Sequence, residues 1–338
     1  MASANTYDNT DGQGSAVGIR EHLLDVISKL DPEENPVFSM AKKVKAKQAF
    51  VEWQIDNLGV PSFNGIEEGV DVVSYNNKHE NLARVGSYCQ KFRRDWKVTT
   101  ELEQSVVAGI KSMVAEAQVK CMKEMKRDIE AAICSDQEMD SGSSNGIRLL
   151  RGLGKYIQTS AQSVNPIPEA YRSPSGHINT TATSSFGVDD IDGVLQSLYN
   201  TVGMPQKNFT LVCGSALKSA ISGLQKNMGS NNVNFLSNVN AADHKLIQHV
   251  SLYDGDFGMV KIMPTNFNGI VSDAGLGTAQ SKARGYLLDP SLIEIAEFLP
   301  TKRVENPDLG GGRRGFVESM LTLIVKNPLG LGKFAATS

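Results

Sequence analysis

The stretch TELEQSVVAGIKSMVAEAQVKCMKEMKRDIEAAICS, residues 100–135, decides the fold of this chain. Its apolar side chains recur with the period of an α-helix, and no proline interrupts them. The positions of this apolar stripe are Leu102, Val106, Ile110, Met113, Ala117, Cys121, Met125, Ile129 and Ala132. At about 1.5 Å per residue, the pattern predicts a single rod on the order of 50 Å long.

Both ends of this helix have sequence signals. Thr100 and Glu103 have the spacing of a capping box, in which each side chain accepts a hydrogen bond from a free backbone N–H. Residues 135–146 are rich in Asp, Ser, Asn and Gly, which end helices. A rod this long is typical of a building block, because its stripe needs more covering surface than a compact monomer offers.

The composition excludes several classes of protein. With 338 residues, 40% of them hydrophobic, the chain can bury a large core without disulfides or metals. No apolar run approaches the roughly eighteen residues of a membrane helix. A net charge of −3 argues against a dedicated nucleic-acid reader. Four cysteines stand singly, which favours reduced, buried thiols over a zinc site or a disulfide scaffold: Cys89, Cys121, Cys134 and Cys213.

Residues 1–45 are expected to form an arm rather than a domain. They contain one short amphipathic helical pattern, residues 19–30, which Asp31-Pro32 and Asn35-Pro36 stop. Residues 1–18 lack the basic and apolar regions of a secretory signal, so we expect synthesis in a cytoplasm. A basic cluster follows, which we interpret as a solvated face or as salt-bridge partners: Lys42, Lys43, Lys45 and Lys47.

A long hairpin precedes the rod. Residues 50–56 and 87–98 both alternate between apolar and polar side chains, which predicts two strands. Their antiparallel pairing would place the acids Glu52 and Asp56 near the bases Lys91, Arg93 or Lys97. The tip between them, residues 59–86, is long and polar. A two-stranded ribbon is marginal alone in water, so this hairpin must lie on a neighbour.

After the rod, residues 136–187 are rich in Ser, Gly, Asn, Pro and Thr. Structureless stretches of this length usually bind something or become ordered on assembly. From residue 188 the pattern predicts a separate α+β lobe. Its expected helices are residues 189–202 and 215–226, and its expected strands are residues 209–213, 246–253, 259–263, 285–288 and 293–298, with turns at Asp254-Gly255 and Asn268-Gly269.

The end of the chain returns to the rod. Residues 299–305 and 316–326 read as two strands joined by the glycine-rich residues 306–315. Four apolar residues of the second strand could cover the apolar stripe of the rod: Val317, Leu321, Leu323 and Val325.

A convergent chemical site is missing from the pattern. Cys213 and Ser215 lie where a strand turns into a helix, so a hydrolase is an alternative, but the glycines of G-x-S-x-G are absent. We expect Ser215 to be a helix N-cap instead. The set Asp243, His244 and His249 has the wrong spacing for a shared metal ion. We therefore predict no catalytic, cofactor-binding or metal-binding residues.

Segments along the whole chain resemble those of the major capsid (major head) proteins of tailed bacteriophages. The segments are REHLLDVI at 20–27, PVF at 36–38, EWQIDNL at 52–58, RVGSYCQKFR at 84–93, KRDIEAA at 126–132, RGL at 151–153, DFG at 256–258, VKI at 260–262 and ESMLTLIVKN at 318–327. The resemblance implies an α+β fold of the phage Hong Kong 97 type. It divides the chain into an N-terminal arm (1–45), an extended hairpin loop (46–98), a peripheral domain with the spine helix (99–187), an axial domain (188–298) and peripheral return strands with the tail (299–338).

The resemblance also implies a function. The subunit would assemble with itself into hexamers and pentamers that form the head shell around double-stranded DNA, in the bacterial cytoplasm. Portal and scaffolding proteins would be partners, and contacts to the packaged DNA would be weak and non-specific. A decoration protein is a further possible partner. No membrane would be involved. The basic clusters leave a minor virion or DNA-packing protein as a further alternative.

We predict that six residues of the hairpin make the contacts to adjacent subunits. Trp53 and Trp96 would be packing anchors of the ribbon. The polar contacts would come from Glu52, Asp56, Arg93 and Arg94.

Overall fold

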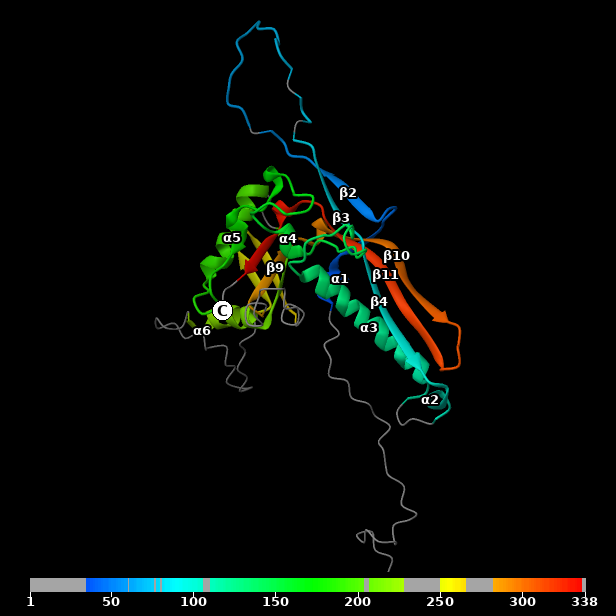
Figure 1. Cartoon of the computed structure of the whole chain (residues 1–338). Coiled ribbons are helices and arrows are strands. Elements are labelled where there is room, and N and C mark those ends of the chain that lie inside the picture. The colour runs from blue at the N-terminus through cyan, green and yellow to red at the C-terminus, as the bar shows by residue number, and fades with distance from the viewer. Residues whose placement is uncertain are drawn as a thin grey trace, which may run out of the picture.

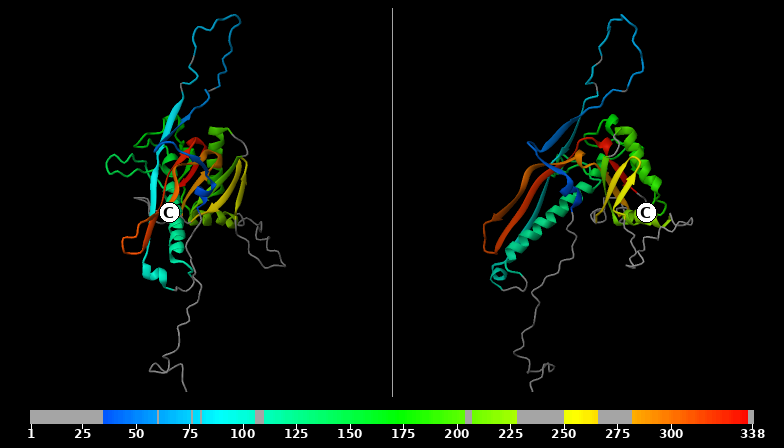
Figure 2. Two further views of the ribbon diagram at one scale, coloured as in Figure 1. Left: turned by 90° about the vertical axis from the view of Figure 1, so that its right-hand side faces the viewer. Right: turned by 180° about the vertical axis from the view of Figure 1, so that it is seen from behind.

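The computed structural model describes residues 35–59, 61–75, 77–79, 81–105, 110–203, 207–227, 250–265 and 282–335. Its strands form three sheets (Figure 1). A four-stranded sheet packs against the long helix, a six-stranded sheet carries helices on one side, and a two-stranded ribbon leads into a projecting loop (Figure 2). The chain is therefore of the predicted α+β class.

The predicted single rod is two helices. Helix α2 (Thr100–Gln104) is capped by Thr99, whose side chain accepts from the Leu102 N–H, so the predicted capping box at Thr100 is wrong by one residue. Helix α3 (Met113–Cys134) starts afresh after Ser112, whose hydroxyl accepts from the Ala115 N–H. Serine hydroxyls compete with the helical backbone for hydrogen bonds, which explains why the continuous apolar stripe did not give a continuous helix. Helix α3 has 22 residues and is about 33 Å long.

The sheet beneath α3 has the order β1-β10-β11-β4. Its strands are β1 (Lys42–Lys45), β10 (Ile293–Asn306), β11 (Arg313–Val325) and β4 (Gln90–Val98). The prediction that the C-terminal strand covers the rod is confirmed, because Val317, Leu321, Leu323 and Val325 are buried in one cluster with Cys121, Met125 and Ile129 of α3.

Two details of this sheet differ from the prediction. Residues 293–298 and 299–305 were expected as separate strands, but β10 continues through both with an irregularity around Leu299. The lysines at 42–45 were expected in an arm, but they form β1, which pairs in parallel with β10. The chain before β1 forms a short helix, α1 (Pro36–Met40), that packs on α3.

The predicted pairing of the hairpin strands is wrong. Strand β2 (Phe50–Ile55) pairs with β3 (Ala83–Tyr88), and Glu52 lies opposite Gly86. The predicted strand 87–98 is divided at Cys89, and its larger part, β4, pairs with β11 instead. Local alternation identified both strands, but it carries no information about which edge a strand joins.

The six-stranded sheet has the order β5-β12-β9-β6-β8-β7. Its strands are β5 (Ile178–Asn179), β12 (Gly332–Ala335), β9 (Arg284–Leu288), β6 (Lys207–Cys213), β8 (Gly258–Pro264) and β7 (Leu252–Gly255). Helices α5 (Val188–Val202) and α6 (Ser215–Asn227) cover the face that carries Leu211 and Leu287, while the alternate residue Tyr286 faces the core beneath α3. This sheet is thus buried on both sides.

Several smaller predictions have different outcomes. The turn expected at Asp254-Gly255 lies at residues 256–257. The N-cap position of α6 is Gly214, whose carbonyl accepts from the Lys218 N–H, rather than Ser215. The helix expected at 19–30, the turn at Asn268-Gly269 and the first half of the strand expected at 246–253 lie outside the described residues.

The polar stretch 136–187 is packed within the subunit. It contains α4 (Leu153–Tyr156) and buries Leu150, Arg151 and Tyr171. The guanidinium of Arg151 donates to the carbonyl oxygens of Val164 and Asn165. Buried charge and backbone hydrogen bonds therefore order this stretch, so the expectation that it becomes ordered on assembly is wrong.

A carboxylate just after α3 connects this helix to the six-stranded sheet. Asp136 accepts from Arg284 of β9 and from Lys333 of β12, both at 2.7 Å. Lys333 also donates to the Gly154 carbonyl at 3.3 Å. A Cβ on Gly154 would overlap Asp136 Oδ1, so this close approach requires glycine. The junction fixes the six-stranded sheet relative to the spine helix.

Candidate assembly surfaces

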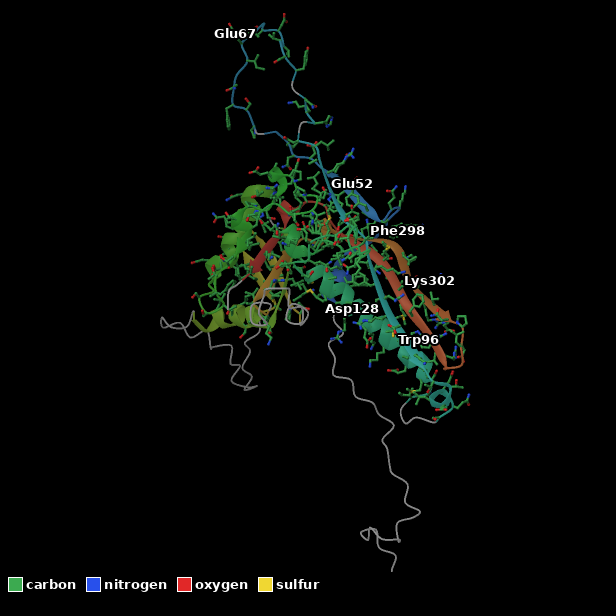
Figure 3. All side chains as sticks on the ribbon, in the orientation of Figure 1. Glu52, Glu67, Trp96, Asp128, Phe298 and Lys302 are labelled. Atoms are coloured by element: carbon green, nitrogen blue, oxygen red, sulfur yellow. The ribbon has the colours of Figure 1, made fainter. Side chains whose placement is uncertain are left out.

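The most exposed part of the described chain is the loop between β2 and β3, residues 56–82, of which residues 60, 76 and 80 are outside the description (Figures 1 and 2). We call it the projecting loop. Its tip, where Figure 3 labels Glu67, extends away from both larger sheets. The loop carries large apolar side chains that are mostly in solvent: Leu58, Phe63, Ile66, Val70, Val72, Val73, Tyr75 and Leu82. A monomer gains nothing from such exposure, so this loop is a candidate contact surface.

The projecting loop is also acidic. Glu67, Glu68 and Asp71 lie at its tip, and no Lys or Arg occurs between Asn57 and Asn77. The sequence pattern predicted a long, polar tip and did not identify its exposed apolar side chains. The available signal was the combination of nine large apolar residues with acids and glycines in residues 56–82.

The base of the projecting loop is anchored to the body of the subunit. The Tyr171 hydroxyl donates to the Asn81 carbonyl at 2.6 Å. Phe50 and Tyr88 stack across the ribbon with ring centroids 4.5 Å apart. The Ser87 hydroxyl contacts the Thr322 hydroxyl of β11 at 3.0 Å. A rigid base therefore presents a loop whose tip has no support within the described chain.

The predicted contact residues occupy two different sheets. Glu52 is exposed on the ribbon and Asp56 is exposed at the start of the projecting loop. Trp53 is half-buried, with its ring centroid 6.3 Å from that of Tyr156. Trp96 of β4 is buried beneath α3. The structure therefore separates the two tryptophans, and only Trp53 packs the base of the ribbon.

The predicted arginines also differ from one another. Arg93 is exposed on the outer face of β4, and its guanidinium lies 5.6 Å from the centroid of the Phe316 ring. Arg94 points to the opposite face and forms a two-pronged ion pair with Asp128 of α3, at 2.6 and 2.7 Å. The hydrogen bond to Asp128 raises the pKa of Arg94. The predicted pairing of Glu52 and Asp56 with these bases is wrong, because β4 belongs to another sheet.

The face of the four-stranded sheet opposite α3 is a second candidate surface, which we call the outer sheet face. In the β4–β11 register, Lys91, Arg93 and Lys97 lie across from Met320, Glu318 and Arg314. Lys91 and Glu318 form an ion pair at 2.7 Å. Arg93 with Lys91 and Arg148 also lines a cavity of about 660 Å³. Cations and half-buried apolar side chains therefore share this face with two acids, Asp95 and Glu318.

The Cys213 and Ser215 pair does not have the properties of a nucleophilic site. Cys213 is fully buried, and burial raises the pKa of its thiol to about 12. Ser215 is exposed on the first turn of α6. The thiol therefore stays protonated, and its environment is that of a core residue.

Metal and membrane binding can be assessed for the described residues. They contain no group of three or more His, Cys, Asp or Glu side chains placed to hold a metal ion. The predicted triple Asp243, His244 and His249 lies outside them. Within the same part of the chain, no helix combines the length and apolarity that a membrane crossing requires.

Comparison with known proteins agrees with this geometry. The profile described as SU10 major capsid protein matches residues 3–338. The chain belongs to the SU10 major capsid protein family. No curated protein matches it.

Solved phage structures share the fold. The capsid structure of cyanophage P-SCSP1u is similar with a TM-score of 0.62 at 10% identity, over 98% of this chain and 97% of that one. The capsid of cyanophage A-1(L) is similar with a TM-score of 0.63 at 11% identity, over 95% of this chain and 98% of that one. A chain of Gordonia phage Cozz is similar with a TM-score of 0.58 at 16% identity, over 100% of this chain and 97% of that one.

Membership in this family confirms the predicted phage Hong Kong 97-type fold and the capsid role. This SU10-type capsid protein is a structural subunit of a virion shell and associates with copies of itself. The hydrolase and minor-virion alternatives are therefore excluded.

Proposed function

We propose that this SU10-type capsid protein assembles as hexamers and pentamers into the head shell of a tailed phage, in the bacterial cytoplasm, around double-stranded DNA. Portal and scaffolding proteins would direct assembly. The proposed division is an arm (1–45), a hairpin loop (46–98), a peripheral domain (99–187 and 299–338) and an axial domain (188–298). The observation that carries the proposal is a family match over almost the whole chain together with a projecting loop that exposes its apolar side chains.

The proposed contact within a capsomer is the projecting loop of one copy on the outer sheet face of the next. The loop is acidic and apolar, with Glu67, Glu68 and Phe63 exposed near its tip. The outer sheet face offers cations, among them Arg93 and Lys97, beside half-buried apolar side chains. Opposite charges set the register of an interface, while buried apolar area supplies most of the free energy.

The contact is heterologous, because loop and sheet face are different surfaces of the same subunit. Heterologous contacts build closed rings when the rotation between copies closes, as five- and six-membered rings require. Each shell would repeat the contact many times, so each copy of it can be weak.

The six predicted residues take different roles in this proposal. Arg93 would meet acids of the incoming loop directly. Glu52 on the ribbon and Asp56 at the start of the loop would contact the neighbour near the base of the loop. Trp53 would set the angle of the ribbon against Tyr156. Arg94 and Trp96 would act within the subunit, because both are already engaged beneath α3.

Charge reversal tests this contact. The variant Arg93→Glu should stay folded and lose particle formation, because the introduced carboxylate would repel the acids of the incoming loop. Adding Glu67→Lys and Glu68→Lys to that variant should restore particles, seen by negative-stain microscopy. The matched control Lys261→Glu removes an exposed cation from β8 and should assemble normally. Normal particle yield from Arg93→Glu would disprove the contact, and a wild-type chain that forms no rings or shells would disprove the proposed function.

A further inference from the structure

The spine helix carries a row of cations on the side away from its buried stripe. Lys120, Lys123 and Lys126 are exposed and Arg127 is half-buried, all within two turns of α3. At 100° per residue, Lys123 lies almost opposite Cys121 and Met125 of the stripe, with the other three cations within about 60° of it. The long side chains therefore point from one face of the helix, which we call the basic row.

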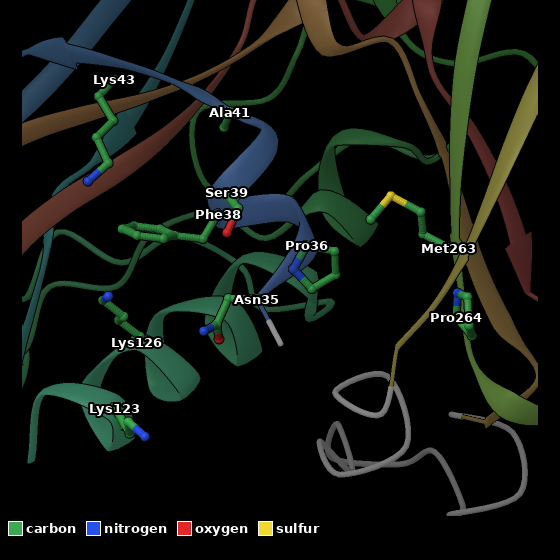
Figure 4. Close-up of a pocket in the computed structure, with 10 residues that line it drawn as sticks. All are labelled: Asn35, Pro36, Phe38, Ser39, Ala41, Lys43, Lys123, Lys126, Met263 and Pro264. Carbon is green, nitrogen blue, oxygen red and sulfur yellow. The ribbon is translucent and has the colours of Figure 1, made fainter. Parts of the chain in front are cut away.

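The basic row continues into a groove. A cavity of about 780 Å³ is lined by Lys123 and Lys126 of α3, by Lys43 of β1 and by Phe38 of α1 (Figure 4). Its far side is formed by Met263 and Pro264 at the end of β8. Figure 4 shows Lys43 and Lys126 extending toward the ring end of Phe38. The Lys43 ammonium lies 4.6 Å from the Phe38 ring centroid.

The cations of this surface outnumber the acids beside it. Glu297 pairs with Lys43 at 3.0 Å. Asp128 is paired with Arg94 on the sheet side of α3. Glu116 lies one turn before the row and Glu124 on its flank. Since the whole chain has a net charge of −3, four cations in two turns are a local concentration rather than a general property.

We propose that the basic row and its groove contact the sugar-phosphate backbone of duplex DNA. The inference rests on the proposed function and specifies where the subunit meets its cargo. Lysine ammoniums on flexible stems act as point charges and impose no bidentate geometry, which suits a polyanion contacted without regard to sequence. A regular row on one helix also fits the regular charge of a duplex better than a peptide, whose binding depends on a few buried anchors.

The proposal assigns the two faces of the peripheral region to different tasks. The side of the four-stranded sheet that carries α1 and α3 would face the lumen. The outer sheet face, on the opposite side of the same sheet, would receive the neighbouring loop. One contact per subunit would be weak, but a closed shell presents the basic row many times to one DNA molecule, so the contacts add as in any multivalent complex.

Salt dependence of DNA binding tests the assignment. The probe is a fluorescent duplex of about thirty base pairs, titrated with the full-length chain over a range of salt concentrations. Each phosphate contact contributes about 0.9 to the slope of log K against log salt. The variant Lys120→Gln/Lys126→Gln should therefore lower the slope by about 1.8. The control Lys261→Gln/Lys302→Gln, which removes two exposed lysines from β8 and β10, should retain the wild-type slope.

Three results would overturn the inference. One is an equal slope for wild type and Lys120→Gln/Lys126→Gln. Another is an equal loss in the control, because binding would then follow net charge alone. The third is a peptide of residues 19–34 that binds wild type but not this variant while DNA binding is unchanged, because the groove would then belong to an acidic segment of the chain. Particle formation is scored separately: variants that assemble but keep the wild-type slope refute the inference alone, whereas a wild-type chain without particles refutes the proposed function.

Discussion

The projecting loop allows a quantitative test through Phe63. Its side chain is 99% exposed, so it contributes no packing within the subunit. If assembly buries it against a neighbour, burial contributes about 1.5–3 kcal/mol per contact. At about 1.4 kcal/mol per tenfold change, Phe63→Ser should raise the threshold concentration for assembly by about 10- to 100-fold. Unfolding of the unassembled subunit should change by less than about 0.5 kcal/mol, as for other exposed positions.

The assay is light scattering during assembly at a series of protein concentrations, with chemical denaturation of the unassembled subunit alongside. The matched control is Phe63→Leu, which retains an apolar side chain and should assemble close to the wild-type threshold. An unchanged threshold for Phe63→Ser would refute the reasoning. So would a large loss of subunit stability, because Phe63 would then pack inside its own chain.

Three further predictions concern the body of the subunit. Gly154→Ala should destabilise it by more than about 2 kcal/mol in denaturant unfolding, because the new Cβ overlaps Asp136 where the spine helix meets the six-stranded sheet, and wild-type stability would contradict this. Burial raises the pKa of Glu130, which also accepts from two backbone N–H groups of α1, at 2.9 and 2.8 Å. A raised folded-state pKa means that its contribution is complete below about pH 4.5 and is lost as pH rises through the folded value, so the stability of wild type relative to Glu130→Gln should fall from pH 4 to neutral pH; a constant difference would disprove this linkage. All four thiols are buried, and burial raises the pKa of Cys213 to about 12, so a disulfide reagent should react rapidly with none of them until the chain unfolds; one fast thiol in the native subunit would contradict the structure.

Local periodicity predicted the elements whose partners lie on one face. The pattern of α5 gave the predicted range almost to the residue, since its buried residues Ile191, Leu195 and Leu198 have helical spacing. The alternation of β11 predicted this strand in the same way and also predicted that its apolar face packs on the buried stripe of the spine helix. In both cases a single amphipathic face determines the conformation and the direction of burial.

The candidate assembly surfaces were predicted less well. Trp53 packs at the base of the ribbon, but Trp96 and Arg94 belong to another sheet, where Trp96 is buried and Arg94 pairs with Asp128 of α3. The error came from treating residues 87–98 as one strand, because alternation continues across Cys89 while the pairing partner changes. Neither Phe63 nor the basic row was identified, because exposure depends on what the rest of the chain leaves uncovered.

The amino-acid sequence alone determined the secondary-structure elements with a clear period and, through the resemblance of many short segments, the capsid family. The tertiary structure decided where the spine helix begins, which strands pair and that the polar stretch 136–187 is packed within the subunit. The physical reason is that period and propensity act over a few residues. Strand pairing and the ordering of Arg151 instead depend on hydrogen bonds and buried contacts between segments far apart in the chain.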